Sequence, residues 1–140
     1  MNWLPYALLS ALFAGITAVL AKVGISGVNS NLATAIRTTV VFFFTWGIAF
    51  ATCKPSAMLV LTGRTWLFLG LSGVATGLSW LCYFRAIQLG EVSRVAPVDK
   101  LSVLFVIAFA ALFLHEPLTL QHWIGGGLIA AGAIVLAWGA

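Results

Sequence analysis

Two adjacent charged residues, Asp99 and Lys100, stand in an apolar stretch just after Pro97, from which Asp99 is separated by one residue. A charge near the centre of a membrane helix costs about 2.5–3.5 kcal/mol on insertion scales, so such residues usually face a partner or an aqueous cavity. Pro97 lacks a backbone N–H and frees a carbonyl on the preceding turn, as in the irregular helices that line membrane binding sites. Asp99 is therefore a candidate to bind a proton, a cation or an amine, with Lys100 as its partner. The alternative is a salt bridge at the membrane surface.

Two further basic residues, Arg37 and Lys22, are predicted on the same side of the membrane as Asp99. Arg37 lies about two turns into a predicted helix, too deep for snorkelling of its side chain to be the whole explanation. A guanidinium that faces the interior could meet Asp99 or bind an anionic group bidentately. Anchoring at lipid headgroups is the alternative for both residues, and it is the favoured one for Lys22.

The balance of these embedded charges indicates the kind of ligand. Lys22, Arg37 and Lys100 outnumber Asp99 three to one, so a pocket among them would suit an anion or a zwitterion, such as a carboxylated or phosphorylated metabolite. Trp80 and Tyr83 could line the same cavity. The alternative for these two rings is the aromatic belt of the membrane interface.

No constellation of catalytic, metal-binding or nucleic-acid-binding residues is recognisable. The sequence offers no catalytic triad, phosphate loop or HExxH motif, and His115 and His122 are too few for a site that wants three or four ligands. Seven basic residues against three acidic ones give a charge of +4, but they are scattered singly, unlike a nucleic-acid face. We expect no catalytic residue, metal or cofactor, and no nucleic-acid partner.

The elements that must position these residues are membrane helices. The chain is 62% hydrophobic and only 7% charged, with a mean hydropathy of +1.11. Apolar runs of about 20 residues suffice to cross a bilayer, and runs that are apolar on all sides are helices rather than barrel strands. The sequence predicts an all-α polytopic bundle that fills residues 1–140 as a single domain. Its five helices are predicted at residues 3–22, 31–53, 65–89, 93–114 and 119–140.

Glycines mark the faces at which these helices could approach one another. Gly73 and Gly77 form a GxxxG pair in the third predicted helix, and Gly126 and Gly132 belong to a fifth helix rich in small residues. Such faces allow close helix packing in membranes. For the fifth helix, dimerisation and packing within the bundle are equally supported.

The distribution of basic residues leaves the topology open. Counting every Lys and Arg, the positive-inside rule places the N-terminus outside. Without the embedded residues, Lys54 and Arg64 on one side balance Arg85 and Arg94 on the other. A balanced count is typical of a protein that inserts in both orientations.

The third to fifth predicted helices also carry the motifs of a known family. Residues 85–90, residues 96–102, and the run from Phe113 to Glu116 followed by Trp123 resemble an EamA-type repeat of the drug/metabolite transporter superfamily. The resemblance extends upstream through residues 31–37 and covers essentially the whole chain. Asp99 and Lys100 stand where the usual EamA pattern is apolar, as in short single-repeat members.

The resemblance implies a function and an assembly. Typical EamA transporters are similar to two inverted five-helix repeats, so a lone repeat could rebuild the transporter as a homodimer, with an antiparallel arrangement favoured. We expect a multi-pass secondary transporter in the cytoplasmic (inner) membrane of a prokaryote, which moves a polar metabolite by alternating access with proton coupling through Asp99. Its partners would be the small-molecule substrate and membrane lipid. The alternatives are a non-transporting subunit or scaffold of a larger assembly, and a translocase of lipid-linked sugars.

The candidate residues thus form two groups, one for binding and one for helix packing. The substrate- or ion-binding candidates are Asp99, Lys100, Arg37, Lys22, Trp80, Tyr83 and Ser102, and the helix-packing candidates are Gly73, Gly77, Gly126 and Gly132.

Overall fold

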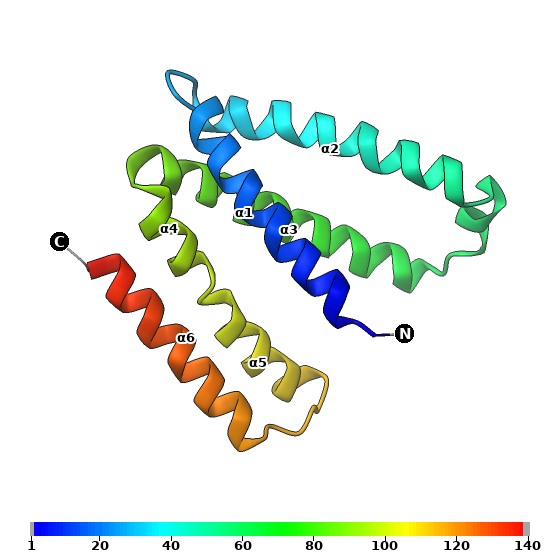
Figure 1. Ribbon diagram of the computed structural model, residues 1–140. Helices are drawn as coiled ribbons and strands as arrows, with labels where there is room; N and C mark the ends of the chain where they lie inside the picture. The colour runs from blue at the N-terminus through cyan, green and yellow to red at the C-terminus, as the bar shows by residue number, and fades with distance from the viewer. Residues whose placement is uncertain (1, 139–140) are drawn as a thin grey trace. The chain divides into compact units, whose positions relative to one another are not determined.

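The computed structural model describes residues 2–138, and every regular element among them is a helix (Figure 1). The elements are α1 (Leu4–Gly24), α2 (Ser30–Thr52), the 3-10 helix η1 (Pro55–Val60), α3 (Gly63–Leu89), α4 (Val92–Asp99), α5 (Ser102–Phe113) and α6 (Leu120–Trp138). Within the described residues, five segments are long and apolar enough to cross a membrane, with α4 and α5 together forming one of them. The prediction of an all-α membrane bundle is confirmed. Residues 139 and 140, which end the fifth predicted helix, lie outside the described residues.

The threonine hydroxyls of α2 are satisfied inside the helix. Five threonine hydroxyls each donate to the backbone carbonyl four residues earlier, at 2.8–3.0 Å. Such bonds remove the cost of an unpaired hydroxyl in a medium without water. These threonines are Thr34, Thr38, Thr39, Thr45 and Thr52.

Side chains in the loops fix where the helices begin. The Asn29 side chain accepts from the backbone N–H groups of Asn31 at 2.9 Å and Leu32 at 3.4 Å, which makes it the N-cap of α2. Before α6, the ring Nδ1 of His122 accepts from the backbone N–H of Thr119 at 3.0 Å. This is the backward half of a capping box, with His in the place of the usual Glu or Gln.

The chain divides into two compact units, one of residues 23–88 and one of residues 1–22 with 89–140. In the unit of residues 23–88, α2 and α3 run antiparallel on either side of η1 (Figure 1). Its buried side chains gather where α2 begins and α3 ends, with Phe84 3% and Ile87 0% exposed. Gln88 closes this end, because its amide donates to the Val28 carbonyl at 2.8 Å.

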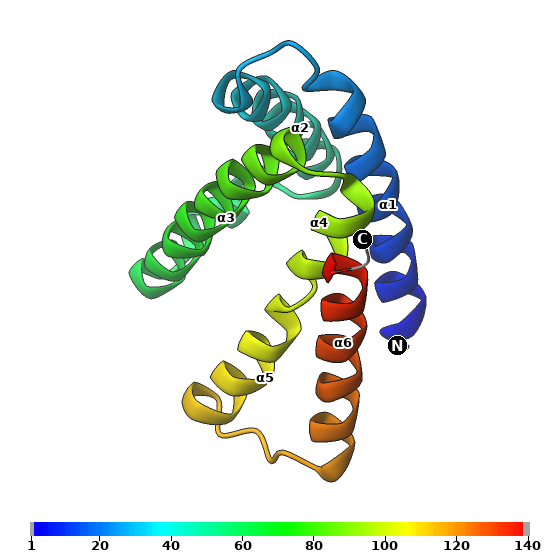
Figure 2. The ribbon, with the colours of Figure 1, turned by 90° about the vertical axis from the view of Figure 1, so that its left-hand side faces the viewer.

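In the other unit, α6 packs along α4 and α5 (Figure 2). Gly126 is buried at this contact, and a Cβ there would lie 3.0 Å from Leu104 Cδ2 and 3.5 Å from Ile107 Cδ1. At Gly132, one and a half turns further along α6, a Cβ would meet no described atom within 4 Å. Of these two glycines of α6, Gly126 therefore packs on α5, whereas Gly132 has open space beside it.

This difference between two glycines of one helix gives a stability prediction. Gly126→Leu should destabilise the protein by about 1–3 kcal/mol, because the new side chain overfills the contact with Leu104. Gly132→Leu is the matched control and should change stability by no more than about 0.5 kcal/mol. Thermal unfolding in detergent, followed by loss of helical circular dichroism, measures both. Equal losses of stability in the two variants would show that overfilling the contact of Gly126 with α5 is not what destabilises Gly126→Leu.

The fourth predicted helix is interrupted in the structure and forms two helices, α4 and α5. The sequence predicts one continuous helix over residues 93–114, but α4 ends at Asp99 and α5 begins at Ser102. Across the division, Lys100 N–H donates to the Pro97 carbonyl at 3.1 Å and Leu101 N–H to the Val98 carbonyl at 3.0 Å. These three-residue steps are the tighter 3-10 type. The interruption follows Pro97, which cannot donate to the preceding turn.

Candidate functional site

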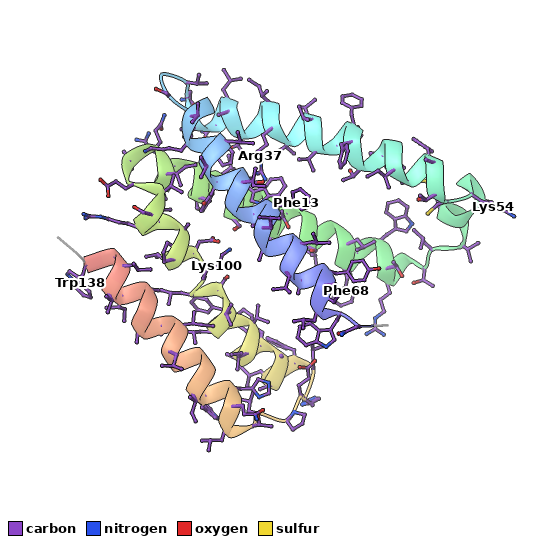
Figure 3. The ribbon with its side chains drawn as sticks, viewed as in Figure 1. Phe13, Arg37, Lys54, Phe68, Lys100 and Trp138 are labelled. Carbon is purple, nitrogen blue, oxygen red and sulfur yellow. The ribbon has the colours of Figure 1, made fainter. Side chains whose placement is uncertain are left out.

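Arg37 is held against two aromatic rings inside the unit of residues 23–88. Its guanidinium carbon lies 4.2 Å from the centroid of the Trp80 ring and 5.4 Å from that of Phe84. Trp80 and Phe84 are four residues apart on α3 and so share a face of that helix. Arg37 and Trp80 are half-buried, and Phe84 is buried. Figure 3 labels Arg37 on α2.

The electrostatic surroundings of Arg37 are unusual for a charge in a membrane span. Residues 23–88 contain no Asp or Glu, since the three acidic residues of the chain are Glu91, Asp99 and Glu116. Within its own unit the positive charge of Arg37 is therefore met by the negative faces of aromatic rings. A ring occupies the face of a guanidinium, whereas the N–H donors lie in the guanidinium plane. The arrangement can hold Arg37 in place while its edge hydrogen-bonds an anion.

The remaining candidates of this unit are placed as follows. Tyr83 is half-buried and directly precedes Phe84 on α3. At Gly73 and Gly77, an added Cβ would meet no described atom within 4 Å. The GxxxG face is thus open in the single chain, and its role in helix packing stays a prediction.

Asp99 and Lys100 lie at the interruption between α4 and α5. Lys100 Nζ is 3.3 Å from Asp99 Oδ2, with 58% of the lysine side chain and 37% of the aspartate side chain exposed. Figure 3 shows Lys100 at this point of the chain. Ser102 begins α5 and is also exposed. Lys100 is thus the described partner of the Asp99 carboxylate, and both side chains stay partly exposed in the single chain.

Arg37 and Asp99 belong to different units, each of which is described by itself. A meeting of these two residues therefore stays a prediction. Within its own unit, Arg37 contacts Trp80 and Phe84, and Asp99 in the other unit contacts Lys100.

Lys22 has a different environment, which the sequence did not reveal. Its Nζ donates to the Gly90 carbonyl oxygen at 2.8 Å. Glu91 and Arg94 lie in the same region, with 3.2 Å between Arg94 Nε and a Glu91 carboxylate oxygen. The ion pair of Glu91 and Arg94 could have been predicted from the sequence, because opposite charges three residues apart on a helix lie side by side. The bond from Lys22 to the Gly90 carbonyl could not, because every residue has a backbone carbonyl.

Comparisons with known proteins agree on one family. The sequence pattern of the EamA-like transporter family matches residues 1–138. The chain is 54% identical over 136 residues to an uncharacterized transporter in the cobO 3'region of Sinorhizobium sp, and the match covers 97% of this chain and 96% of that protein.

More distant similarity links the chain to flippase subunits. It is 36% identical over 73 residues to the probable 4-amino-4-deoxy-L-arabinose-phosphoundecaprenol flippase subunit ArnE of Enterobacter sp. (strain 638), covering 52% of this chain and 68% of that one. The subunit of the same name from Yersinia pestis (strain Pestoides F) is 31% identical over 85 residues, covering 61% of this chain and 73% of the subunit. No solved structure matches the chain.

Proposed function

The chain belongs to the EamA-like transporter family, and on this premise we propose that it is a secondary transporter, not an enzyme, which moves an anionic or zwitterionic metabolite. The observation that carries the proposal is Arg37, whose charge lies in a membrane span, in a unit without an acidic residue and against the rings of Trp80 and Phe84. A half-buried guanidinium whose faces contact rings can still offer the donors at its edge, which suit a carboxylate or a phosphate. Trp80 orients Arg37, and Tyr83 contributes to the wall of the site.

Asp99 supplies the coupling in this proposal. It lies at an interrupted helix, paired with Lys100, and interrupted helices with ionisable groups are typical of the ion sites of secondary transporters. Ser102, at the start of α5, is the neutral polar group next to it. Proton binding at Asp99 would then drive the exchange between outward-open and inward-open states in the cytoplasmic membrane of a prokaryote.

A homodimer completes the pathway. One five-span repeat has its termini on opposite sides of the membrane, so an antiparallel pair forms the inverted arrangement of a two-repeat transporter. The open face at Gly73 and Gly77 supports a contact between copies. Single cysteines at Ser56 and Ser93, in a Cys53→Ala, Cys82→Ala background, should both react with an impermeant maleimide from both sides of the membrane. Reaction from one side only would contradict the antiparallel pair.

A second candidate function is supported by the relatives. The ArnE relatives are named as probable flippase subunits for a lipid-linked phosphate that carries an amino sugar, which is itself a zwitterionic group. In that case the chain would be one subunit of an assembly that translocates a polyprenyl phosphate-linked sugar, and Arg37 would bind its phosphate.

Purified protein in proteoliposomes tests the proposal. A panel of carboxylated and phosphorylated metabolites, together with a polyprenyl phosphate, is screened for ligands that raise the thermal unfolding midpoint. Stabilising ligands are then tested for uptake driven by a pH gradient. Stabilisation by a soluble anion supports the first candidate, and stabilisation by the polyprenyl phosphate alone supports the second. A complete lack of anion-dependent stabilisation would contradict both.

A further inference from the structure

An open hollow of about 420 Å³ lies in the unit of residues 1–22 and 89–140, whereas Arg37 belongs to the other unit. It is formed where the membrane span of α1 ends and the span of α4 and α5 begins. Span ends lie at the depth of the lipid headgroups. The hollow is lined by Lys22, Leu89, Gly90, Glu91 and Arg94.

The polar groups of the hollow are held in place by the chain itself. The bond from Lys22 Nζ to the Gly90 carbonyl, 2.8 Å long, fixes the ammonium beside the turn that joins α3 to α4. Glu91 engages Arg94 through its Nε at 3.2 Å. No described residue bonds the two terminal nitrogens of Arg94, which carry the donors that suit two oxygens of one phosphate.

The charges of the lining leave one positive charge in excess, with Lys22 and Arg94 against Glu91. The carboxylate opposes an anion, but it is already paired, and its side chain is 71% exposed. Leu89, which is 72% exposed, adds an apolar surface beside the charged groups. A net cationic hollow with an apolar wall, at headgroup depth, is complementary to an amphiphile with a negatively charged phosphate.

We infer that this hollow binds the phosphate group of an anionic membrane lipid through Lys22 and Arg94. The lipid is retained at the end of the α1 span, and its acyl chains lie along the apolar side of the helices. This role is independent of the proposed transport substrate, because it uses neither Arg37 nor Asp99.

Native mass spectrometry of the detergent-solubilised protein tests the inference, with phosphatidylglycerol, phosphatidylcholine and inorganic phosphate as probes. The wild-type chain should retain phosphatidylglycerol in preference to phosphatidylcholine. Lys22→Gln and Arg94→Gln should each weaken this retention by about tenfold, as expected for loss of a charged hydrogen bond. Arg94→Gln keeps the structural bond between Lys22 and Gly90. Weaker lipid retention in this variant therefore cannot be explained by the loss of that bond.

The control is Lys54→Gln, which removes an exposed lysine at the far end of α2 (Figure 3). It should leave phosphatidylglycerol retention unchanged. Equal retention of the two lipids by the wild type would overturn the inference, as would equal losses in all three variants. Displacement of phosphatidylglycerol by an equal concentration of inorganic phosphate would also overturn it, in favour of a soluble phosphate.

Discussion

Arg37→Ala should lower the affinity for the transported anion by roughly 10- to 100-fold, so a ligand concentration that just saturates the wild type should stabilise the variant much less. The reason is that hydrogen bonds between a charged donor and a charged acceptor contribute about 1.5–3 kcal/mol, and about 1.4 kcal/mol corresponds to one factor of ten. Among the described basic residues of 23–88, Arg37 is the one that lies over two rings. The midpoint shift at saturating ligand, measured beside the ligand-free midpoint, separates lost binding from lost folding.

Two variants make the Arg37 experiment specific. Arg37→Lys keeps the charge but loses the planar fork and its stacking on Trp80, so affinity should fall to an intermediate value. Arg64→Ala is the matched control, because Arg64 also lies over a ring, with its guanidinium 5.7 Å from the Phe68 centroid, yet it begins α3 and is exposed. Wild-type binding by Arg37→Ala, or an equal loss in Arg64→Ala, would remove Arg37 from the site.

The helices were predictable because their signal is local. Runs of about 20 apolar residues report a membrane span whatever the tertiary structure, and caps such as Asn29 follow from residue type. The division of the fourth helix was not predicted, although Pro97 was recognised. The segment from Val92 to Phe113 still contains an 18-residue window with a mean hydropathy of 2.0, so hydropathy does not distinguish one continuous helix from two.

The side-chain partners were less predictable, because they depend on how distant segments align. Arg37 and Trp80 were each singled out by residue type and depth, but their contact requires the register of α2 against α3. The bond of Lys22 to Gly90 joins residues 68 positions apart through a backbone carbonyl, which every residue possesses. Sequence patterns therefore select ionisable residues in apolar helices and partners close in sequence, such as Lys100 for Asp99. Partners distant in sequence emerge only from the fold.

Asp99→Asn should abolish uptake driven by a pH gradient while substrate exchange at equal pH continues. An asparagine has nearly the size of an aspartate and can still accept a hydrogen bond from Lys100, but it has no proton to bind and release. The substitution thus removes the titratable group but keeps a side chain of nearly the same size between α4 and α5.

Uptake and counterflow in the same proteoliposomes measure the two activities separately. Glu116→Gln is the matched control, since Glu116 is an exposed carboxylate whose residue contacts Ala110 through its backbone N–H, and gradient-driven uptake should persist in this variant. Persistence of uptake in Asp99→Asn would exclude Asp99 as the coupling group, because titration is the one property that the substitution removes completely. Loss of counterflow as well would instead assign Asp99 to substrate binding, and the energy source would then have to reside in a group other than the carboxylate beside Pro97.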